Sequence, residues 1–163
     1  MVKIDTLLAE GKISKIPELE LERYITFFEH SSIDNLAHGH AVLATFPRWS
    51  IISGYYAMHD RTKLLLARLF RLKIELEVHA TAIKVLREVL HNQELLALME
   101  KAYKEFLSLA NDLADAKQER VNTQYFTGTV YSVEQYKQRA EVFLEETVIP
   151  FLVKINLLIG EKP

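Results

Sequence analysis

A run of five polar residues interrupts a segment that is otherwise apolar, and it could carry chemistry. The run consists of His59, Asp60, Arg61, Thr62 and Lys63. The flanking residues predict a helix with two adjacent apolar stripes, so some of these side chains should point out of the bundle. In the functional interpretation an acid, a base and a cation lie beside a cleft at or near Arg120. The alternative is a solvated face with a local ion pair, which the pattern alone favours.

Arg120 stands out because it continues an apolar heptad pattern. The apolar positions are Leu95, Met99, Ala102, Phe106, Leu109, Leu113 and Ala116. A guanidinium at the next core-facing position needs an anion, a carbonyl cluster or water. Arg120 is therefore a candidate for binding phosphate, with Tyr125 supplying a ring and a hydroxyl. The alternative is a helix end at which the stripe simply reaches solvent.

The residue pattern gives little support for metal chemistry. Glu88 and His91 have the Glu-x-x-His spacing of di-iron bundles, but those sites need a second copy of the motif. His38 and His40 should lie on different sides of a helix, so they would not chelate one ion. The chain has no cysteine, which excludes disulfides and thiolate sites. We predict no metal and no cofactor, and His79 beside an apolar stripe is either a core histidine or a secondary ligand-binding residue.

Composition indicates one globular domain. The chain has 163 residues, of which 49% are hydrophobic and 26% charged, and we expect a single domain over 1–163 with its core in about 17–160. The formal net charge of −2 provides no strong field for nucleic acid or an anionic membrane, although a local basic patch is compatible with it. The first residues lack a signal-peptide pattern, and no apolar run has membrane-spanning length. We expect a cytoplasmic protein.

Apolar periodicity and few turn residues predict an all-α fold, an antiparallel up-and-down bundle of four to five helices. Ser31-Ser32 either breaks the first helix or lies within it, and the second helix should be central. Ser132 with Gln135 resembles a capping box, Pro150 should kink the last helix, and Gly160 should end it. The expected helices run from Pro17 to Phe46-Pro47, from Arg48 to Phe70, from Glu75 to His91, from Asn92 to a loop at 122–131, and from Ser132 to Gly160.

Three segments of the chain stand in a characteristic order. They are 53–58 with the leucines at 64–66, then Lys73 and His79, and finally 120–125, which reads Arg-Val-Asn-Thr-Gln-Tyr. Together they resemble HEPN domains, a family of small prokaryotic helical domains, over about 32–158. The first segment is similar to the second core helix of that family, Lys73 and His79 resemble the Lys and His that follow it, and 120–125 resembles an Arg-x-x-Ala-Asp-Tyr signature.

The resemblance implies a homodimer that works near nucleotides or RNA, in some members as partner of a minimal nucleotidyltransferase in toxin–antitoxin systems. The small residues Ser53, Gly54 and Ala57 also suggest a dimer contact. Family ribonucleases carry an Arg followed by a His, but Tyr125 stands at the His position, and Tyr is a poor base at neutral pH. Asp60 likewise replaces a usual His, with His59 at the preceding Phe position.

These departures favour a binding module over an enzyme. The leading hypothesis is a nucleotide or RNA site lined by Arg120 and Tyr125, with Lys63, Asp60, His79 and His59 as secondary residues. One alternative is a metal-independent ribonuclease in which Arg120 stabilises the transition state and His59 or His79 is the base. The other is a purely structural adaptor.

Overall fold

The computed structural model describes residues 3–90, 92–122 and 133–160, with the backbone alone for 110, 112–122 and 133. It is mostly helical, with one small antiparallel ribbon. The N-terminal part contains α1 (Ile4–Ala9), β1 (Ile13–Lys15), α2 (Glu18–Val42) and α3 (Pro47–Leu65), which continues into the π-helical turn η1 (Leu66–Phe70). The remainder contains β2 (Leu72–Ile74), α4 (Val78–Val89), α5 (Gln93–Asn122), α6 (Val133–Phe143), the π-helical turn η2 (Leu144–Val148) and α7 (Ile149–Ile159).

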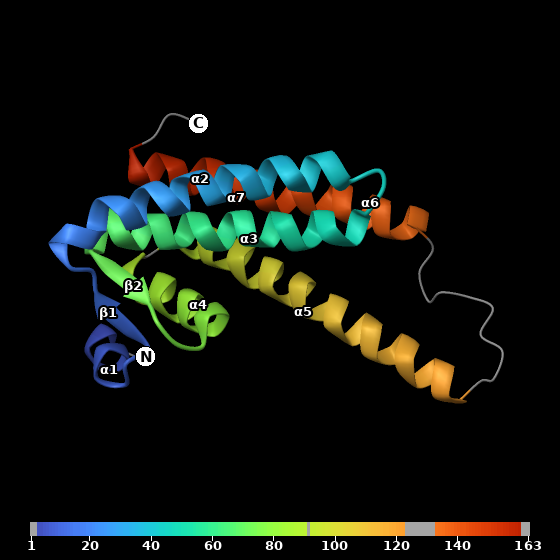
Figure 1. Ribbon diagram of the computed structural model, residues 1–163, viewed down its shortest axis with the longest axis horizontal. Helices are drawn as coiled ribbons and strands as arrows, with labels where there is room; N and C mark the ends of the chain where they lie inside the picture. Colours follow the sequence, from blue (N-terminus) through green and yellow to red (C-terminus); the bar gives the residue numbers. More distant parts are fainter. Residues whose placement is uncertain (1–2, 91, 123–132, 161–163) are drawn as a thin grey trace.

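Helix α3 is the centre of the bundle, as its two apolar stripes predict. It contacts α2, α4, α5, α6 and α7, and its large side chains at Ile51, Tyr55 and Met58 are fully buried. Helices α2 and α7 run alongside α3, whereas α5 diverges from it toward its C-terminal end (Figure 1). The mostly helical fold is confirmed, although the described residues form more helices than the four to five expected and also a small ribbon. Helix α3 is the element that positions most of the candidate residues.

Small residues let two neighbours approach α3 closely. A Cβ on Gly39 of α2 would lie 3.3 Å from the carbonyl oxygen of Ser50. A Cβ on Gly54 would lie 2.9 Å from Leu144 Cδ2 and 3.0 Å from Val148 Cγ2. The small-residue patch that suggested a dimer contact is therefore filled within one chain, and this argument for a dimer is wrong.

The sequence analysis missed the N-terminal helix and the ribbon. β1 pairs antiparallel with β2, with Ile13 opposite Ile74 and Lys15 opposite Leu72. Strands of three residues are too short for a periodic signal, and these two are far apart in the sequence. Because Leu7 and Ile13 are fully buried, the packed core begins before Pro17.

Most helix boundaries follow local sequence signals. Helix α2 passes through Ser31-Ser32 without a break and ends at Val42, so Pro47 begins α3 rather than ending α2. The N-cap at Asn92 is confirmed, since its Oδ1 accepts a hydrogen bond from the backbone N–H of Leu95 at 3.0 Å. Gly160 ends α7 with φ of 82°, as predicted.

Pro150 was expected to kink the last helix. The irregularity there is the π-helical turn η2, which ends at Val148, two residues before Pro150. A proline lacks the N–H of the helical ladder and crowds the carbonyl four residues earlier, and a wider turn relieves both problems. The proposed capping residue Ser132 lies outside the described residues.

Candidate functional site

The polar run of α3 is buried. His59 is 1% exposed and Asp60 is 6% exposed, Arg61 and Thr62 are also buried, and Lys63 is partly buried. The expectation of a solvated face is therefore wrong. Its physical reason is the central position of α3, which is covered by other helices along this stretch. A polar group in such a place needs partners within the protein.

Asp60 is the hub of these partners. Its Oδ2 accepts hydrogen bonds from Ser31 Oγ at 2.6 Å and from Asn35 Nδ2 at 3.0 Å, both on α2. Its Oδ1 lies 3.9 Å from Lys63 Nζ and 3.8 Å from His59 Nδ1. One carboxylate therefore holds α2 against α3 and places negative charge beside a lysine and a histidine.

Lys63 lies beside Asp60 at the α2 side of α3. Its Nζ is 4.6 Å from the ring centroid of Phe28, a cation–π geometry. Burial lowers the pKa of Lys63, and the charge of Asp60 partly offsets this effect. Among the described residues, no acceptor lies within hydrogen-bonding distance of Nζ. Lys63 is thus a half-buried cation with free donor capacity.

His59 and His79 meet between α3 and α4, with ring centroids 5.0 Å apart. His59 Nε2 lies 3.4 Å from the carbonyl oxygen of Val78, and a carbonyl only accepts, so His59 carries its proton on Nε2. His59 Nδ1 has no hydrogen-bond partner among the described residues. His79 Nδ1 shares a hydrogen bond of 2.8 Å with Tyr55 Oη.

The electrostatics around His79 keep it neutral. Burial lowers the pKa of His79, and the nearby His59 and Lys63 lower it further. Burial also raises the pKa of Tyr55, so its hydroxyl stays protonated near neutral pH. The pair is therefore an uncharged hydrogen bond at the boundary of the core.

Aromatic rings surround the two histidines. Tyr55 stacks on Phe106 of α5 with centroids 4.5 Å apart, and His79 stacks on Tyr103 at 6.0 Å. Tyr55 is fully buried, whereas Tyr56, Tyr103 and Phe106 are partly exposed. These ring contacts pack both histidines between α3, α4 and α5.

The structure thus brings together four candidate residues, His59, Asp60, Lys63 and His79, which we call the α3 cluster. Arg120 belongs to the last turn of α5, and its side chain and the whole of Tyr125 lie outside the described residues. Along α5, Arg120 is 14 residues beyond Phe106, which corresponds to about 21 Å at 1.5 Å per residue. The α3 cluster therefore does not share one small site with Arg120 (Figure 1).

Sequence reasoning missed the residues that support the α3 cluster. Ser31 was considered only as a break or as an interior position of the first helix, Phe28 and Tyr55 only as apolar positions at helical spacing, and Asn35 was not singled out. The helical periodicity of a sequence assigns each residue to one face of its helix. It does not show which polar side chains of two helices will contact each other. The excess of polar residues on both facing helices was the one available signal.

Metal ligands do not cluster in the described part of the chain: no group of three or more His, Asp or Glu side chains there could hold an ion. His38 Nδ1 contacts Ser53 Oγ at 2.7 Å, so it serves the α2–α3 contact. His91 lies outside the described residues. In the described helices, none is long and apolar enough to cross a membrane.

Comparisons with known proteins identify no relative. No family model matches this chain, and neither a curated protein nor a solved structure shows significant similarity to it.

Proposed function

We propose that this chain is a HEPN-like helical module that binds a nucleotide or a short stretch of RNA without cleaving it. The observation that carries the proposal is Lys63, a half-buried cation held 3.9 Å from Asp60. Asp60 already accepts hydrogen bonds from Ser31 and Asn35, so it satisfies Lys63 only in part. A phosphate oxygen is a strong acceptor that would complete the lysine's coordination.

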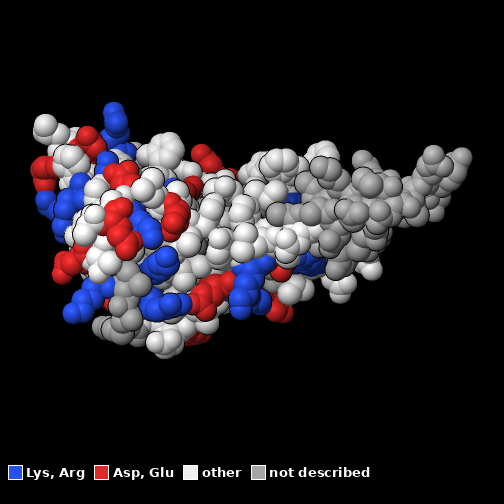
Figure 2. Space-filling model, turned by 90° about the horizontal axis from the view of Figure 1, so that it is seen from below, with Lys and Arg blue, Asp and Glu red and all other residues white. Residues whose placement is uncertain are grey.

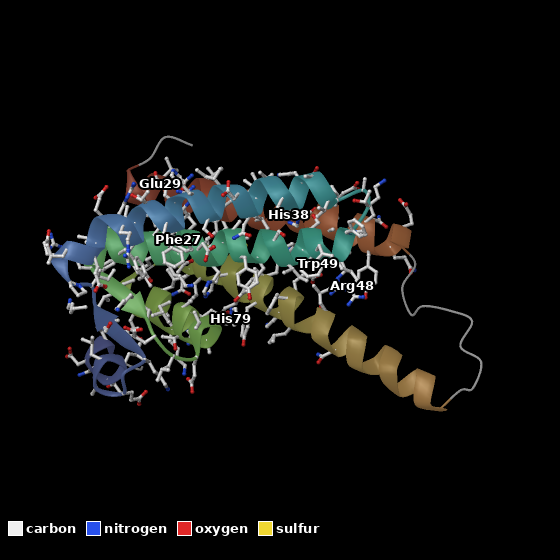
Figure 3. The ribbon with its side chains drawn as sticks, viewed as in Figure 1. Phe27, Glu29, His38, Arg48, Trp49 and His79 are labelled. Carbon is white, nitrogen blue, oxygen red and sulfur yellow. The ribbon has the colours of Figure 1, made fainter. Side chains whose placement is uncertain are left out.

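The aromatic surroundings of Lys63 suit a nucleobase. A surface pocket of about 260 Å³ lies along α2 and is lined by Glu20, Arg23, Tyr24, Phe27 and Phe28. Phe27 is 62% exposed and contacts Phe28, the ring that Lys63 covers, edge to face at 5.0 Å. Exposed rings beside cations bind bases by stacking and phosphates by charge, with little dependence on sequence. Figure 3 shows Phe27 in front of α3, the helix alongside which α2 runs.

The surface charges favour a small ligand over long nucleic acid. Figure 2 shows Lys and Arg interspersed with Asp and Glu over the end of the molecule that holds α1 and α4. A protein that tracks a nucleic-acid backbone presents a continuous basic stripe. The charges on this face are mixed, so the face offers no continuous basic track for a long nucleic acid.

The ribonuclease alternative has weaker support in the described residues. A general base must reach the proton that it removes. His59 is 1% exposed and donates to Val78, and the Nδ1 atom of His79 is taken by Tyr55. Both histidines therefore serve the packing of α3 against α4, which favours binding over catalysis.

Calorimetric titration of the protein with ADP and with a short single-stranded RNA tests this proposal. Lys63→Gln should weaken binding about tenfold or more, since it removes one charge-assisted contact to phosphate. The matched control is Lys84→Gln, which removes a lysine paired with Glu77 on the surface of α4. Equal affinities for the wild type and Lys63→Gln would refute the site. Absence of any binding would favour the structural adaptor.

We also propose a homodimer, and a nucleotidyltransferase as a further partner in a toxin–antitoxin-type system. The partner enzyme is implied by the resemblance alone. The dimer has one structural argument of its own, an exposed apolar stripe on α7 formed by Ile149, Val153 and Leu157 at four-residue spacing. Exposed apolar stripes on a helix are typical of contact surfaces.

A further inference from the structure

A second surface feature lies at the turn between α2 and α3, away from the α3 cluster. It is a groove of about 400 Å³, which we call the turn groove. Its lining residues are Thr45, Phe46, Pro47, Arg48, Trp49, Ile52 and Tyr136. In Figure 3, Arg48 and Trp49 lie side by side near the α6 end of α3, far along the helix from His79. Nothing in the proposed nucleotide site uses these residues.

The turn groove exposes large aromatic surface. Phe46 is 61% exposed, and Trp49, the chain's single tryptophan, is 58% exposed. Pro47 is buried and begins α3, so the backbone between these two rings has a fixed direction. Trp, Tyr and Arg are the residues that most often dominate the binding energy of protein interfaces, and all three line this groove.

Among the described residues that line the turn groove, Arg48 alone carries a charge. Its guanidinium lies 5.5 Å from the ring centroid of Tyr136, and among the described residues no carboxylate lies within 4.0 Å of it. Arg139 also stacks on Tyr136, at 5.8 Å, but it is paired with Glu105. The sequence contains no Asp or Glu between Asp34 and Asp60, so this end of the hairpin is free of acidic residues.

We propose that the turn groove docks an acidic segment of a protein partner, one that places an apolar side chain against Phe46 and Trp49 and a carboxylate on Arg48. The aromatic rings supply the apolar anchor site, and the exposed guanidinium supplies a planar fork for a carboxylate. Charge complementarity selects the sign of the partner, because the described lining residues of the groove include a cation and no acid. The site is independent of nucleotide binding at Lys63.

Tryptophan fluorescence measures docking directly, because Trp49 is the chain's only tryptophan. The probes are two short amphipathic peptides free of Trp, one of Leu, Ala and Glu, the other with Lys in place of Glu. The acidic peptide should shift Trp49 emission to the blue and saturate, whereas the basic peptide should bind about tenfold or more weakly. Arg48→Glu, a change at an exposed position, should reverse this preference while the circular dichroism spectrum stays the same.

Three outcomes would overturn the proposal. The first is an emission shift that is the same for both peptides or is unaffected by Arg48→Glu, which indicates unspecific apolar contact. The second is an emission shift that appears without peptide as the protein concentration rises, and that disappears at concentrations where light scattering finds only the monomer. That result would assign the groove to a second copy of the chain. The third is a shift caused by a short RNA but by neither peptide. Because Lys63→Gln leaves the turn groove intact, failure of the nucleotide site would not change these results.

Discussion

At the scale of single residues, Asp60 is the most consequential side chain that the structure describes. It is buried on α3 and serves Ser31, Asn35 and Lys63 at once. Asp60→Ala leaves the Ser31 hydroxyl and the Asn35 amide without their acceptor, and it leaves Lys63 without the nearby negative charge. We predict that it lowers the free energy of unfolding in urea by about 3–5 kcal/mol, the range for breaking a buried pair.

Two variants make this measurement specific. Asp60→Asn keeps an acceptor for Ser31 and loses only the charge, so its cost should be smaller than that of Asp60→Ala. Asp34→Ala removes an exposed carboxylate from α2 and should change stability by less than about 0.5 kcal/mol. A cost for Asp60→Ala as small as that for Asp34→Ala would show that the hub does not hold α2 and α3 together.

His79 should make stability depend on pH. Its pKa in the folded protein is lowered from the ordinary value of 6.5 by burial, His59 and Lys63, so the unfolded chain binds a proton more readily. Stability is then fully present above pH 6.5 and is lost as the pH falls through the folded pKa. Urea unfolding between pH 7.5 and 5 should show this decline, with a shallower slope in His79→Gln. An unchanged slope would show that His79 does not cause the decline.

At the scale of elements, the approach of α3 to η2 depends on Gly54. An added methyl group would meet Leu144 at 2.9 Å and Val148 at 3.0 Å. Overpacking of this kind costs about 1–3 kcal/mol and outweighs the gain of about 1 kcal/mol in helix propensity. We therefore predict that Gly54→Ala is destabilising in urea, although the same change stabilises most helices.

A double-mutant cycle isolates this contact. Leu144→Ala alone should cost about 2–5 kcal/mol, because it leaves a cavity in the core. In Gly54→Ala/Leu144→Ala the new methyl occupies part of that space, so the total cost should be less than the sum of the single costs. Additive costs would mean that Leu144 moves away freely and that the close approach does not limit the fold.

The N-cap of α5 gives a second test at this scale. Asn92→Ala removes the side-chain acceptor for the Leu95 N–H and should cost about 1 kcal/mol in urea unfolding. Asn92→Ser keeps a capping oxygen and should be nearly neutral. Equal costs for both variants would show that Asn92 contributes through something other than the cap.

Some features of these elements could be predicted from the sequence. Local sequence patterns indicate the N-cap at Asn92, the end of α7 at Gly160 and the central position of α3. The β1–β2 ribbon depends on two three-residue strands that meet only after folding, which no local pattern encodes. For the site, the sequence supplied His59, Asp60, Lys63 and His79 as candidates. Their mutual contacts, and the partners Ser31 and Asn35, depend on how α2 and α4 rotate against α3.

At the scale of the whole molecule, the apolar stripe of α7 predicts a homodimer. Val153→Glu places a charge on the stripe without entering the core, since Val153 is exposed. Light scattering at tens of micromolar should give twice 18.9 kDa for the wild type and 18.9 kDa for Val153→Glu. Leu19→Glu, at an exposed leucine on α2, is the control that should remain dimeric. A wild-type mass of 18.9 kDa would refute the dimer.

Amide chemical-shift mapping by NMR during titration with ADP tests directly whether the ligand binds at Lys63. We predict that the largest shifts occur in α2 near Phe27 and Phe28 and in α3 near Lys63, and that these shifts vanish in Lys63→Gln. Shifts confined to the region of Arg120 and Tyr125 would move the site to the far end of α5. If neither millimolar ADP nor the short RNA shifted any amide resonance, the binding function itself would be contradicted.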